Sequence, residues 1–416
     1  MKYHFDFKPF SKKQAKILTW WCPNSPVKDK HGIIADGAIR SGKTVSMGIS
    51  FVQWAMATFN NQNFAMCGKT VGSFRRNVWG WLRVALLSMG YKIQERHTQG
   101  LIIITFKEHT NNFYIFSGKD ESSQDLIQGI TLAGVFFDEV ALMPESFVSQ
   151  ATGRCSVTGS KFWFNCNPDS PDHWFKKQWL DKAEEHKLIH LHFELEDNLS
   201  LSQDIIQRYK MLYYGVFYQR FILGLWVIAE GAIYDMFHDD NLYDDEERNH
   251  DIAYRRYIGI DYGTTNPMVF LDCYDDGDSL WIENEYYYDS REKGVQKTDE
   301  QYADDLEKFC GGNRPDYVIV DPSASSFKLV LRNRGFRVKD AENDVLNGIR
   351  LVSTMLGRLK LRINRRCKKT TEEMRSYVWD YKASLHGEER PVKERDHCPD
   401  ALRYIVKTIV KRIRLI

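Results

Sequence analysis

The sequence contains no long apolar run. None of its 416 residues belongs to a stretch of about eighteen consecutive apolar residues, the pattern of a membrane-spanning helix. The opening residues, MKYHFDFKPF, contain no apolar segment of the kind that a secretory signal requires. We therefore expect neither a membrane anchor nor secretion.

Cysteine is scarce, and its spacing shows no metal-binding pattern. The eight cysteines include no CxxC pair and no Cys/His spacing typical of a zinc site. In a chain of this length they are most simply reduced, buried thiols in a cytosol. Internal repeats and low-complexity tracts are absent as well, so a repeat architecture is not expected.

Net charge is close to zero, but the charges are unevenly distributed. The formal net charge is +1, with 43% hydrophobic and 27% charged residues, which is typical of a soluble globular protein. Basic residues gather in segments 358–369 and 403–416, whereas acidic residues gather in 238–251. This distribution is compatible with a polyanionic partner but does not require one.

Two domains are expected, because 416 residues exceed the size of an ordinary single core. The polar and acidic segment 238–251 separates two regions of strand and helix patterns. We therefore predict a first domain over residues 1–230, a linker over 231–255 and a second domain over 256–416.

The first domain is predicted to be an α/β domain with a mostly parallel sheet. Helical patterns cover residues 43–58 and about 72–88. Apolar or β-branched runs predict strands at 31–37, 63–69, 101–106, 112–118, 132–139 and 161–168. Of these, 101–106 and 112–118 are expected to form an antiparallel pair. Strands that alternate with helices are typical of a parallel sheet covered on both faces.

The second domain shows strands followed by helices. Strands are predicted at 255–261, 268–274, 279–288 and 316–321, the first three as a meander. A last helix is predicted from about Pro399 to the C-terminal residue, with proline at its first position and basic residues in its last turn.

The stretch DGAIRSGKTV contains the strongest functional motif. Gly37 and the run Gly42, Lys43, Thr44 match the pattern G-x-x-x-x-G-K-[ST] between a predicted strand and a predicted helix, with Ser41 in the same loop. Glycines allow backbone N–H groups to approach phosphate oxygens, and the helix N-terminus favours negative charge. Lys43 is expected to reach the β- and γ-phosphates of ATP, and Thr44 to bind Mg²⁺.

Two acids stand at the end of the predicted strand 132–139, where a phosphate-binding loop needs an acidic partner. We expect Asp138 to hold Mg²⁺, directly or through water, and Glu139 to orient and deprotonate the attacking water. Asn167, or alternatively Asn165, is a candidate sensor of the γ-phosphate. A polar strand end before a turn that contains proline is the competing interpretation of these asparagines.

Arg40 lies three residues before Lys43 and is a candidate for stabilising the transition state of hydrolysis. A guanidinium can contact the transferred phosphoryl group bidentately as negative charge gathers there. The alternative is an ion pair with a structural carboxylate. Arg154 is a second candidate, which would act on a neighbouring subunit.

Three acids in the second half form a candidate metal site. Asp261 and Asp321 each end a predicted strand, and Asp400 opens the last predicted helix. Such acids can converge on two divalent ions about 4 Å apart, which activate water and stabilise the departing 3′-oxygen of a phosphodiester. Mg²⁺ or Mn²⁺ suits these ligands better than zinc. Asp396 and His397 are further candidates, as ligands or proton carriers, or else as surface groups or helix caps.

Six motifs in this order resemble the large terminase subunit of tailed bacteriophages and prophages: GAIRSGKT, FFDE, FNCNP, IGIDYG, VIVDPS and DHCPDALRY. The resemblance covers nearly the whole chain. It implies an N-terminal P-loop ATPase of the ASCE type, which moves double-stranded DNA into a procapsid. It also implies a C-terminal nuclease of ribonuclease H-like fold, which cuts concatemeric DNA in a metal-dependent reaction.

The resemblance also implies roles for individual residues. It assigns ATPase roles to Gln14 (adenine contact), Arg40, Lys43, Thr44, Asp138, Glu139 and Asn167 (coupling motif), and nuclease roles to Asp261, Asp321, His397 and Asp400. Pro399 departs from the small or apolar residue usual in relatives, and it leaves open which of His397 and Asp400 binds metal. The implied partners are double-stranded DNA, a small terminase subunit and the portal protein, with a pentamer on the portal in the cytoplasm of a bacterial host.

Two other functions remain as alternatives. A repair or restriction translocase with a fused nuclease would need strand-separation motifs after FNCNP, and none is convincing. A nucleotide-switched DNA-binding scaffold would not need Glu139. The basic segment 358–369 fits the border of a DNA groove and a solvated helix face equally well.

Overall fold

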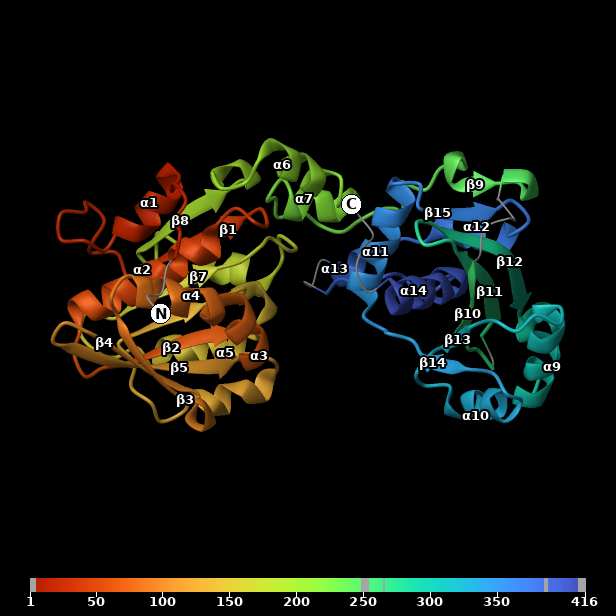
Figure 1. Cartoon of the computed structure of the whole chain (residues 1–416), viewed down its shortest axis with the longest axis horizontal. Helices are drawn as coiled ribbons and strands as arrows, with labels where there is room; N and C mark the ends of the chain where they lie inside the picture. Colours follow the sequence, from red (N-terminus) through yellow and green to blue (C-terminus); the bar gives the residue numbers. More distant parts are fainter. Residues whose placement is uncertain (1–4, 248–253, 265, 385–387, 411–416) are drawn as a thin grey trace. The chain divides into compact units, whose positions relative to one another are not determined.

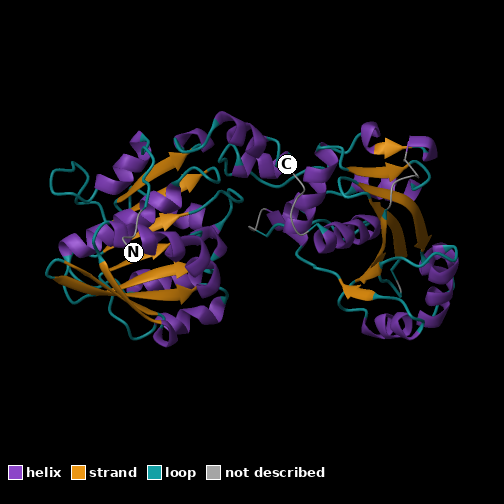
Figure 2. Cartoon of the chain, in the orientation of Figure 1, coloured by secondary structure: helices purple, strands orange, loops and turns teal. Residues whose placement is uncertain are grey.

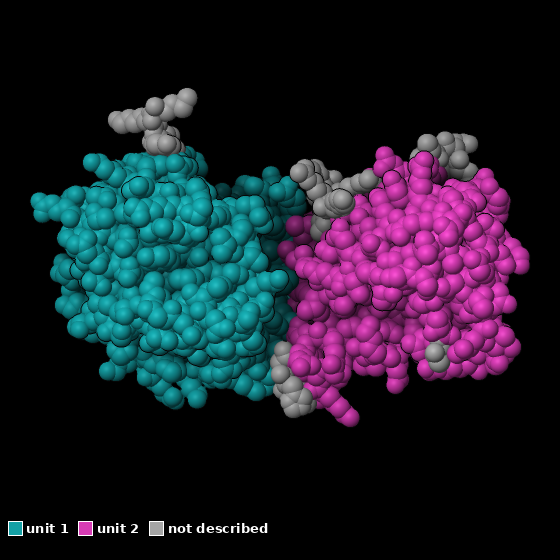
Figure 3. Space-filling model, turned by 90° about the horizontal axis from the view of Figure 1, so that it is seen from below, with its two compact units in different colours: residues 1–210, 218–228 teal, residues 211–217, 229–416 magenta. Residues whose placement is uncertain are grey.

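The computed structural model describes residues 5–247, 254–264, 266–384 and 388–410, with helices and strands in both halves of the chain (Figures 1 and 2). The described residues form two compact units (Figure 3). The first unit comprises residues 1–210 and 218–228, and the second comprises 211–217 and 229–416. All eight cysteines are free thiols; six are buried, and Cys22 and Cys155 are partly buried.

The first unit is built on a mostly parallel eight-stranded sheet of order β3-β4-β5-β2-β6-β7-β1-β8. Its strands are β1 (Gly32–Gly37), β2 (Asn63–Gly68), β3 (Lys92–Arg96), β4 (Leu101–Phe106), β5 (His109–Ser117), β6 (Gly134–Phe137), β7 (Lys161–Asn165) and β8 (Leu188–Phe193). The six neighbouring strands β5, β2, β6, β7, β1 and β8 run parallel to one another. At the other edge of the sheet, β4 pairs antiparallel with both β3 and β5. The predicted parallel sheet and its antiparallel pair are therefore confirmed, and β3 and β8 are additional strands.

Successive side chains of a strand point to opposite faces of the sheet, and each face of this sheet contributes to a buried core. In β1, Ile33 joins a core that includes Phe51 and Trp54 of helix α2. Ile34 joins a second core on the opposite face, which includes Phe147 of helix α5. The longer helices of the unit are α1 (Lys12–Thr19), α2 (Lys43–Thr58), α4 (Gly80–Ser88), α5 (Glu145–Gly153) and α6 (Gln203–Lys210).

The helix predicted at about 72–88 is present but not uniform. It begins as α3 (Val71–Phe74), passes through a π-helical turn over Arg75–Trp79, and continues as α4. The widened turn adds a residue that a strict helical repeat does not include, which sequence periodicity does not reveal.

Helix α7 (Gly215–Phe221) contributes to both units. Residues 211–217 belong to the second unit, where Thr354 Oγ1 donates a hydrogen bond to the Leu212 carbonyl over 2.7 Å. Residues 218–228 belong to the first unit, where the Ile39 N–H donates to the Phe221 carbonyl over 2.8 Å. The chain therefore passes from the first unit to the second, returns, and passes again.

The second unit contains a seven-stranded mixed sheet of order β14-β13-β10-β11-β12-β15-β9. Its strands are β9 (Leu242–Tyr243), β10 (Arg255–Asp261), β11 (Met268–Asp275), β12 (Leu280–Tyr288), β13 (Tyr317–Val320), β14 (Val338–Asp340) and β15 (Leu361–Asn364). The predicted meander β10-β11-β12 is antiparallel, and β13 pairs parallel to β10. Ile260 is opposite Val320 in that register, so Asp261 and Asp321 follow at adjacent strand ends.

Helices cover both faces of the second sheet. They are α8 (Ser290–Lys293), α9 (Asp299–Cys310), α10 (Ser325–Asn333), α11 (Val345–Gly357), α12 (Lys368–Ser376), α13 (Tyr381–Ser384) and α14 (His397–Ile409). Side chains of α9 and α10 share a core with β10 and β11. Helix α14 approaches the opposite face closely, because a Cβ on Gly259 of β10 would lie 2.4 Å from Ile405 Cγ1. The sequence predicted Pro399 at the first position of this helix, but α14 begins at His397 and Pro399 is its third residue.

Charged segments of the second unit pair with one another. The basic segment 358–369 contains strand β15, where Leu361 and Ile363 are buried, so its interpretation as a helix face is wrong. Arg362 lies 3.1 Å from Glu247, and Arg366 also pairs with an acid of the segment 238–251. That acidic segment, expected as part of the linker, contributes β9, and β9 pairs with β15. Residues 248–251 and 411–416 lie outside the described residues.

Candidate functional site

The loop between β1 and α2 adopts a conformation that requires glycine at two positions. Gly37 and Gly42 have φ values of 120° and 84°, in the range that L side chains rarely adopt. A Cβ on Gly42 would lie 2.1 Å from Gln14 Nε2, and a Cβ on Gly37 would lie 2.0 Å from the Phe193 carbonyl oxygen. The loop backbone is therefore held close to its neighbours, with the N-terminus of α2 at its end.

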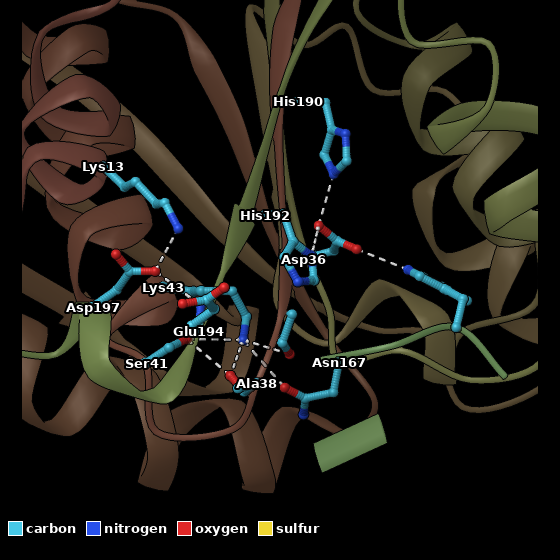
Figure 4. A network of polar contacts seen from close by, with 12 residues as sticks. Lys13, Asp36, Ala38, Ser41, Lys43, Asn167, His190, His192, Glu194 and Asp197 are labelled. Atoms are coloured by element: carbon cyan, nitrogen blue, oxygen red, sulfur yellow. Dashed lines mark hydrogen bonds and ion pairs between the residues drawn. The ribbon is translucent and has the colours of Figure 1, made fainter. Parts of the chain in front are cut away.

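Lys43 is held by the loop in which it lies (Figure 4). Its Nζ donates to the carbonyl oxygens of Gly37 and Ala38 over 3.1 and 2.6 Å, and to Ser41 Oγ over 3.2 Å. A fourth contact of 3.3 Å joins Nζ to Asn167 Oδ1. Burial lowers the pKa of Lys43 to about 8. The ammonium group thus lies at the base of the loop, where phosphate oxygens would offer it negatively charged partners.

Asp138, one of the two acids predicted to accompany the loop, contacts Thr44 there. Thr44 Oγ1 donates to Asp138 Oδ1 over 3.1 Å. Asn165 Nδ2 donates to the same Asp138 oxygen over 2.8 Å, and Asn165 Oδ1 accepts the Glu139 N–H over 2.9 Å. Burial raises the pKa of Asp138, although the hydrogen bonds from Asn165 and Thr44 oppose this effect. Asn165 therefore organises the acidic pair, whereas Asn167 contacts Lys43.

These groups line a pocket of about 540 Å³. The lining includes residues 39–45 of the loop and helix start, both acids and both asparagines, together with Asn77, Trp81 and Asn198. Arg40 lies at this pocket with φ 55°, and its carbonyl accepts from Asn198 Nδ2 over 2.6 Å. Within the described residues, the Arg40 guanidinium has no hydrogen bond or ion pair, so it is free to contact a ligand in the pocket.

Gln14 joins the first helix to the loop. Its side chain is buried, and its Oε1 accepts the Ser11 N–H over 2.8 Å in the capping box of α1. Its Nε2 lies 3.4 Å from the Gly42 carbonyl oxygen. Gln14 thus lies beside the phosphate loop, but it is not among the residues that line the pocket.

The three acids of the second unit gather around helix α14. Asp261 Oδ2 lies 2.9 Å from His397 Nδ1, and Tyr404 donates to Asp321 Oδ2 over 2.6 Å. Asp400, one turn before Tyr404, is buried on the same helix. Burial raises the pKa of Asp261 to about 6, and the negative charge of Asp400 adds to this effect. Asp400 therefore influences Asp261 electrostatically, whereas Asp321 is joined to the same helix through Tyr404.

Each of these acids is engaged by a protein partner. Arg403 Nη2 lies 2.9 Å from Asp400 Oδ1, and Lys393 Nζ lies 3.2 Å from Asp400 Oδ2. Lys393 also lies 3.0 Å from Asp396 Oδ2. Although burial lowers the pKa of His397, its hydrogen bond to Asp261 raises that pKa above its ordinary value.

In the described part of the chain, no three His, Cys, Asp or Glu side chains form a metal-ligand cluster. The chemistry of the donor set nevertheless fits a hard divalent cation, because its members are carboxylates and one imidazole. Burial is the main cause of the raised pKa of Asp261, and the negative charges of Asp400 and Asp396 add to it, so a bound cation would offset that repulsion. The residues present therefore fit Mg²⁺ or Mn²⁺.

Comparisons with known proteins identify the family. The family model "Terminase large subunit, T4likevirus-type, N-terminal" matches residues 34–238. A solved structure of the large terminase from the thermophilic bacteriophage D6E matches at a TM-score of 0.89 and 55% sequence identity, covering 97% of this chain and 100% of that chain. This chain belongs to the large terminase family. No curated protein matches the sequence.

Other D6E structures contain nucleotides. The D6E large terminase in complex with ADP matches this large terminase at a TM-score of 0.86 and 54% identity, over 97% of this chain and 100% of that chain. The D6E complex with ATP-gamma-S matches at 0.85 and 53%, with the same coverage. The predicted two-domain α/β architecture and the role in packaging phage DNA are thereby confirmed for this large terminase. No helix in its described ranges is long and apolar enough to cross a membrane.

Sequence reasoning missed one buried polar network of this large terminase (Figure 4). Asp36, directly before Gly37, has 1% of its surface exposed. Its Oδ1 lies 2.7 Å from His190 Nε2 and 3.2 Å from His192 Nδ1, and its Oδ2 accepts from Trp226 Nε1 over 2.7 Å. The signal was the His-x-His alternation in β8, which places both imidazoles on one face next to β1.

Proposed function

We propose that this large terminase binds ATP in the pocket of the first unit and hydrolyses it. The observation that carries this proposal is the meeting of Lys43, Thr44, Asp138 and Glu139 at one pocket behind a glycine-dependent loop. Thr44 and Asp138 would hold Mg²⁺, which supplies neutralisation of phosphate charge. The D6E complexes with ADP and ATP-gamma-S support nucleotide binding at a pocket of this kind.

The other residues assigned to ATP binding and hydrolysis have separate roles. Glu139 orients the attacking water and accepts its proton; partial removal from water and the neighbouring Asp138 raise the pKa of this carboxylate, which makes it a better base. Arg40 stabilises the charge that gathers on the transferred phosphoryl group. Asn167 contacts the γ-phosphate from its place beside Lys43, and Gln14 contacts the adenine.

We further propose that the second unit cuts double-stranded DNA as a metal-dependent endonuclease. Asp261, Asp321 and Asp400 would hold Mg²⁺ or Mn²⁺, with His397 as a further ligand or as the group that orients Asp261. The bound ions would supply an activated water and stabilisation of the departing 3′-oxygen. Support comes from the family and from the convergence of these acids on α14.

The cellular setting follows from the same proposal. The ATP-driven motor moves double-stranded DNA into the procapsid as a pentamer on the portal protein, and a small terminase subunit delivers the DNA. The motor acts in the cytoplasm of the bacterial host and is transiently at the portal.

Two substitutions test the assignment of two separate sites. Lys43→Ala should abolish ATP hydrolysis and leave the metal-dependent cutting of plasmid DNA intact. Asp321→Ala should abolish cutting and leave hydrolysis intact. Release of inorganic phosphate and conversion of supercoiled plasmid measure the two activities. If either substitution removed both activities from a folded protein, the assignment of two sites would be wrong.

The competing function, a nucleotide switch without chemistry, makes a different prediction. Phosphate release would stay negligible even with DNA, the small subunit and the portal protein present. The position of Glu139 at the pocket favours hydrolysis, because a switch has no need for a group that activates water.

A further inference from the structure

An exposed lysine reaches the acids of the second unit from the solvent. Lys393 Nζ lies 3.0 Å from Asp396 Oδ2 and 3.2 Å from Asp400 Oδ2. The side chain of Lys393 is 62% exposed, whereas those of Asp396 and Asp400 are only 7% and 9% exposed. One ammonium group on an exposed side chain thus contacts two nearly buried carboxylates.

The second cation at Asp400 has a different character. Arg403 is 1% exposed, and its Nη2 lies 2.9 Å from Asp400 Oδ1. Its Nη1 also donates to Asn343 Oδ1 over 2.8 Å, so it is fixed by the core of the unit. Arg403 is therefore a permanent partner of one carboxylate oxygen. Lys393 contacts the other oxygen, and among the described residues its ammonium group pairs only with Asp396 and Asp400.

The two oxygens that Lys393 contacts belong to the crowded acidic group. Asp396 and Asp400 both act on Asp261 through their negative charge. A positive charge placed between Asp396 and Asp400 lowers this repulsion, whether it comes from an ammonium group or from a metal ion. A divalent cation that binds Asp400 Oδ2 must therefore compete with the lysine for that oxygen.

We propose that Lys393 is a displaceable counter-ion of the nuclease carboxylates. In the metal-free protein it pairs with Asp396 and Asp400, and a divalent cation binds Asp400 only after the ammonium group has moved into solvent. The competition lowers the apparent affinity for metal. This inference rests on the proposed nuclease function, and it adds an element that restrains metal loading.

The test measures Mn²⁺ binding directly on the full chain, by the electron paramagnetic resonance signal of free Mn²⁺ in the absence of nucleotide. Asp321→Asn defines the binding that does not involve the nuclease carboxylates. Lys393→Gln should bind Mn²⁺ about three- to tenfold more tightly than the unchanged chain, the size expected from removing exposed ion pairs. Lys393→Arg, which keeps the charge, should not gain affinity.

Lys369→Gln is the matched control. Lys369 is likewise exposed and lies 3.1 Å from Glu372, but that carboxylate is not part of the acidic group. Its substitution should leave Mn²⁺ affinity unchanged. As a second measurement, Mg²⁺ should increase the acylation of Lys393 by an amine-reactive ester, relative to Lys369, in peptide mass spectrometry.

The outcomes separate the inference from the function on which it rests. If Asp321→Asn lowers Mn²⁺ binding but Lys393→Gln does not increase it, the counter-ion role is wrong and the metal site stands. If Asp321→Asn binds Mn²⁺ as well as the unchanged chain does, the proposed nuclease site is itself wrong. A thermal unfolding midpoint for Lys393→Gln near that of the unchanged chain confirms that a folded protein was measured.

Discussion

The Nδ2 of Asn165 donates to Asp138 Oδ1 over 2.8 Å, from the end of the neighbouring strand β7. The same side chain also donates to Thr44 Oγ1 over 3.3 Å and accepts the Glu139 N–H. One amide therefore fixes the orientation of three groups assigned to the metal and the attacking water. Glu139 has φ 59°, a conformation that costs free energy in a residue with a side chain, so it needs such support.

Asn165→Ala should lower the kcat of ATP hydrolysis about 10- to 100-fold, the range seen when a residue that orients metal ligands is removed. The affinity for nucleotide should change much less, because Lys43 and the loop backbone remain. Steady-state kinetics and nucleotide titration measure the two effects. Equal losses in kcat and in affinity for ATP would mean that Asn165 supports the whole loop and not the acids in particular.

Gly42→Ala should prevent nucleotide binding and destabilise the first unit by about 1–3 kcal/mol, because φ is positive there and the new Cβ would meet Gln14. Gly153→Ala is the control, since a Cβ at Gly153 meets no heavy atom within 4 Å and φ is not in the positive range. That change should stay within about 0.5 kcal/mol. Urea unfolding and ATP titration measure both variants. Normal binding by Gly42→Ala would show that the loop tolerates a side chain there.

The Asp36 network predicts a pH dependence of stability. The hydrogen bond between His192 and Asp36 raises the pKa of His192. Burial and the positive charge of Lys13 oppose this rise, whereas the negative charge of Glu194 adds to it. A raised folded-state pKa adds stability that is complete below the unfolded value of about 6.5 and is lost as the pH rises through the folded value. The free energy of unfolding of the unchanged chain should therefore fall between about pH 6 and 8, and less so in His192→Gln.

His97→Gln is the control for this titration, because its side chain is 72% exposed. Urea denaturation at the two pH values measures the difference. Identical pH slopes for His192→Gln and the unchanged chain would exclude a contribution of His192. At the acidic end Asp36 acts in the opposite sense, since its hydrogen bonds to the histidines, against the effect of burial, keep its pKa below the ordinary value. Its contribution is lost as the pH falls through that lowered pKa.

Glu373 is expected to stabilise the start of helix α14. It is buried, accepts the Cys398 N–H over 2.7 Å, and accepts from the Tyr287 hydroxyl over 2.9 Å. Glu373→Gln should lower the free energy of unfolding of the second unit by about 1.5–3 kcal/mol, because hydrogen bonds to a buried charge are replaced by neutral ones. Glu372→Gln, at a side chain 64% exposed, should change stability by less than about 1 kcal/mol. Equal losses for both variants in urea unfolding would contradict this role.

Local sequence patterns were sufficient for the parts of the molecule that are themselves local. The phosphate loop lies within ten residues, and the strand-end acids Asp138 and Asp321 follow runs of buried residues. The partners of Asp36 were not predictable in the same way. His190 and Trp226 come from segments far along the chain, and only the pairing of β1 with β8 brings a histidine to this carboxylate.

Strand β15 was missed for a different reason. Its buried Leu361 and Ile363 alternate with Lys360, Arg362 and Asn364, so the basic composition of the segment 358–369 obscured the period of two. The charges gave the impression of a surface helix or a DNA contact. In the folded unit Arg362 is paired with Glu247 and also with other groups, which composition alone does not reveal.

The route of the chain through α7 means that the motor and the nuclease cannot be parted by severing one peptide bond. A cut after residue 210 leaves the motor half without residues 218–228, including the indole that donates to Asp36. A cut after residue 228 leaves the nuclease half without residues 211–217, which contact helix α11. A single cleavage at either position therefore leaves one of the two units incomplete. We do not expect limited proteolysis at one site to release both units intact.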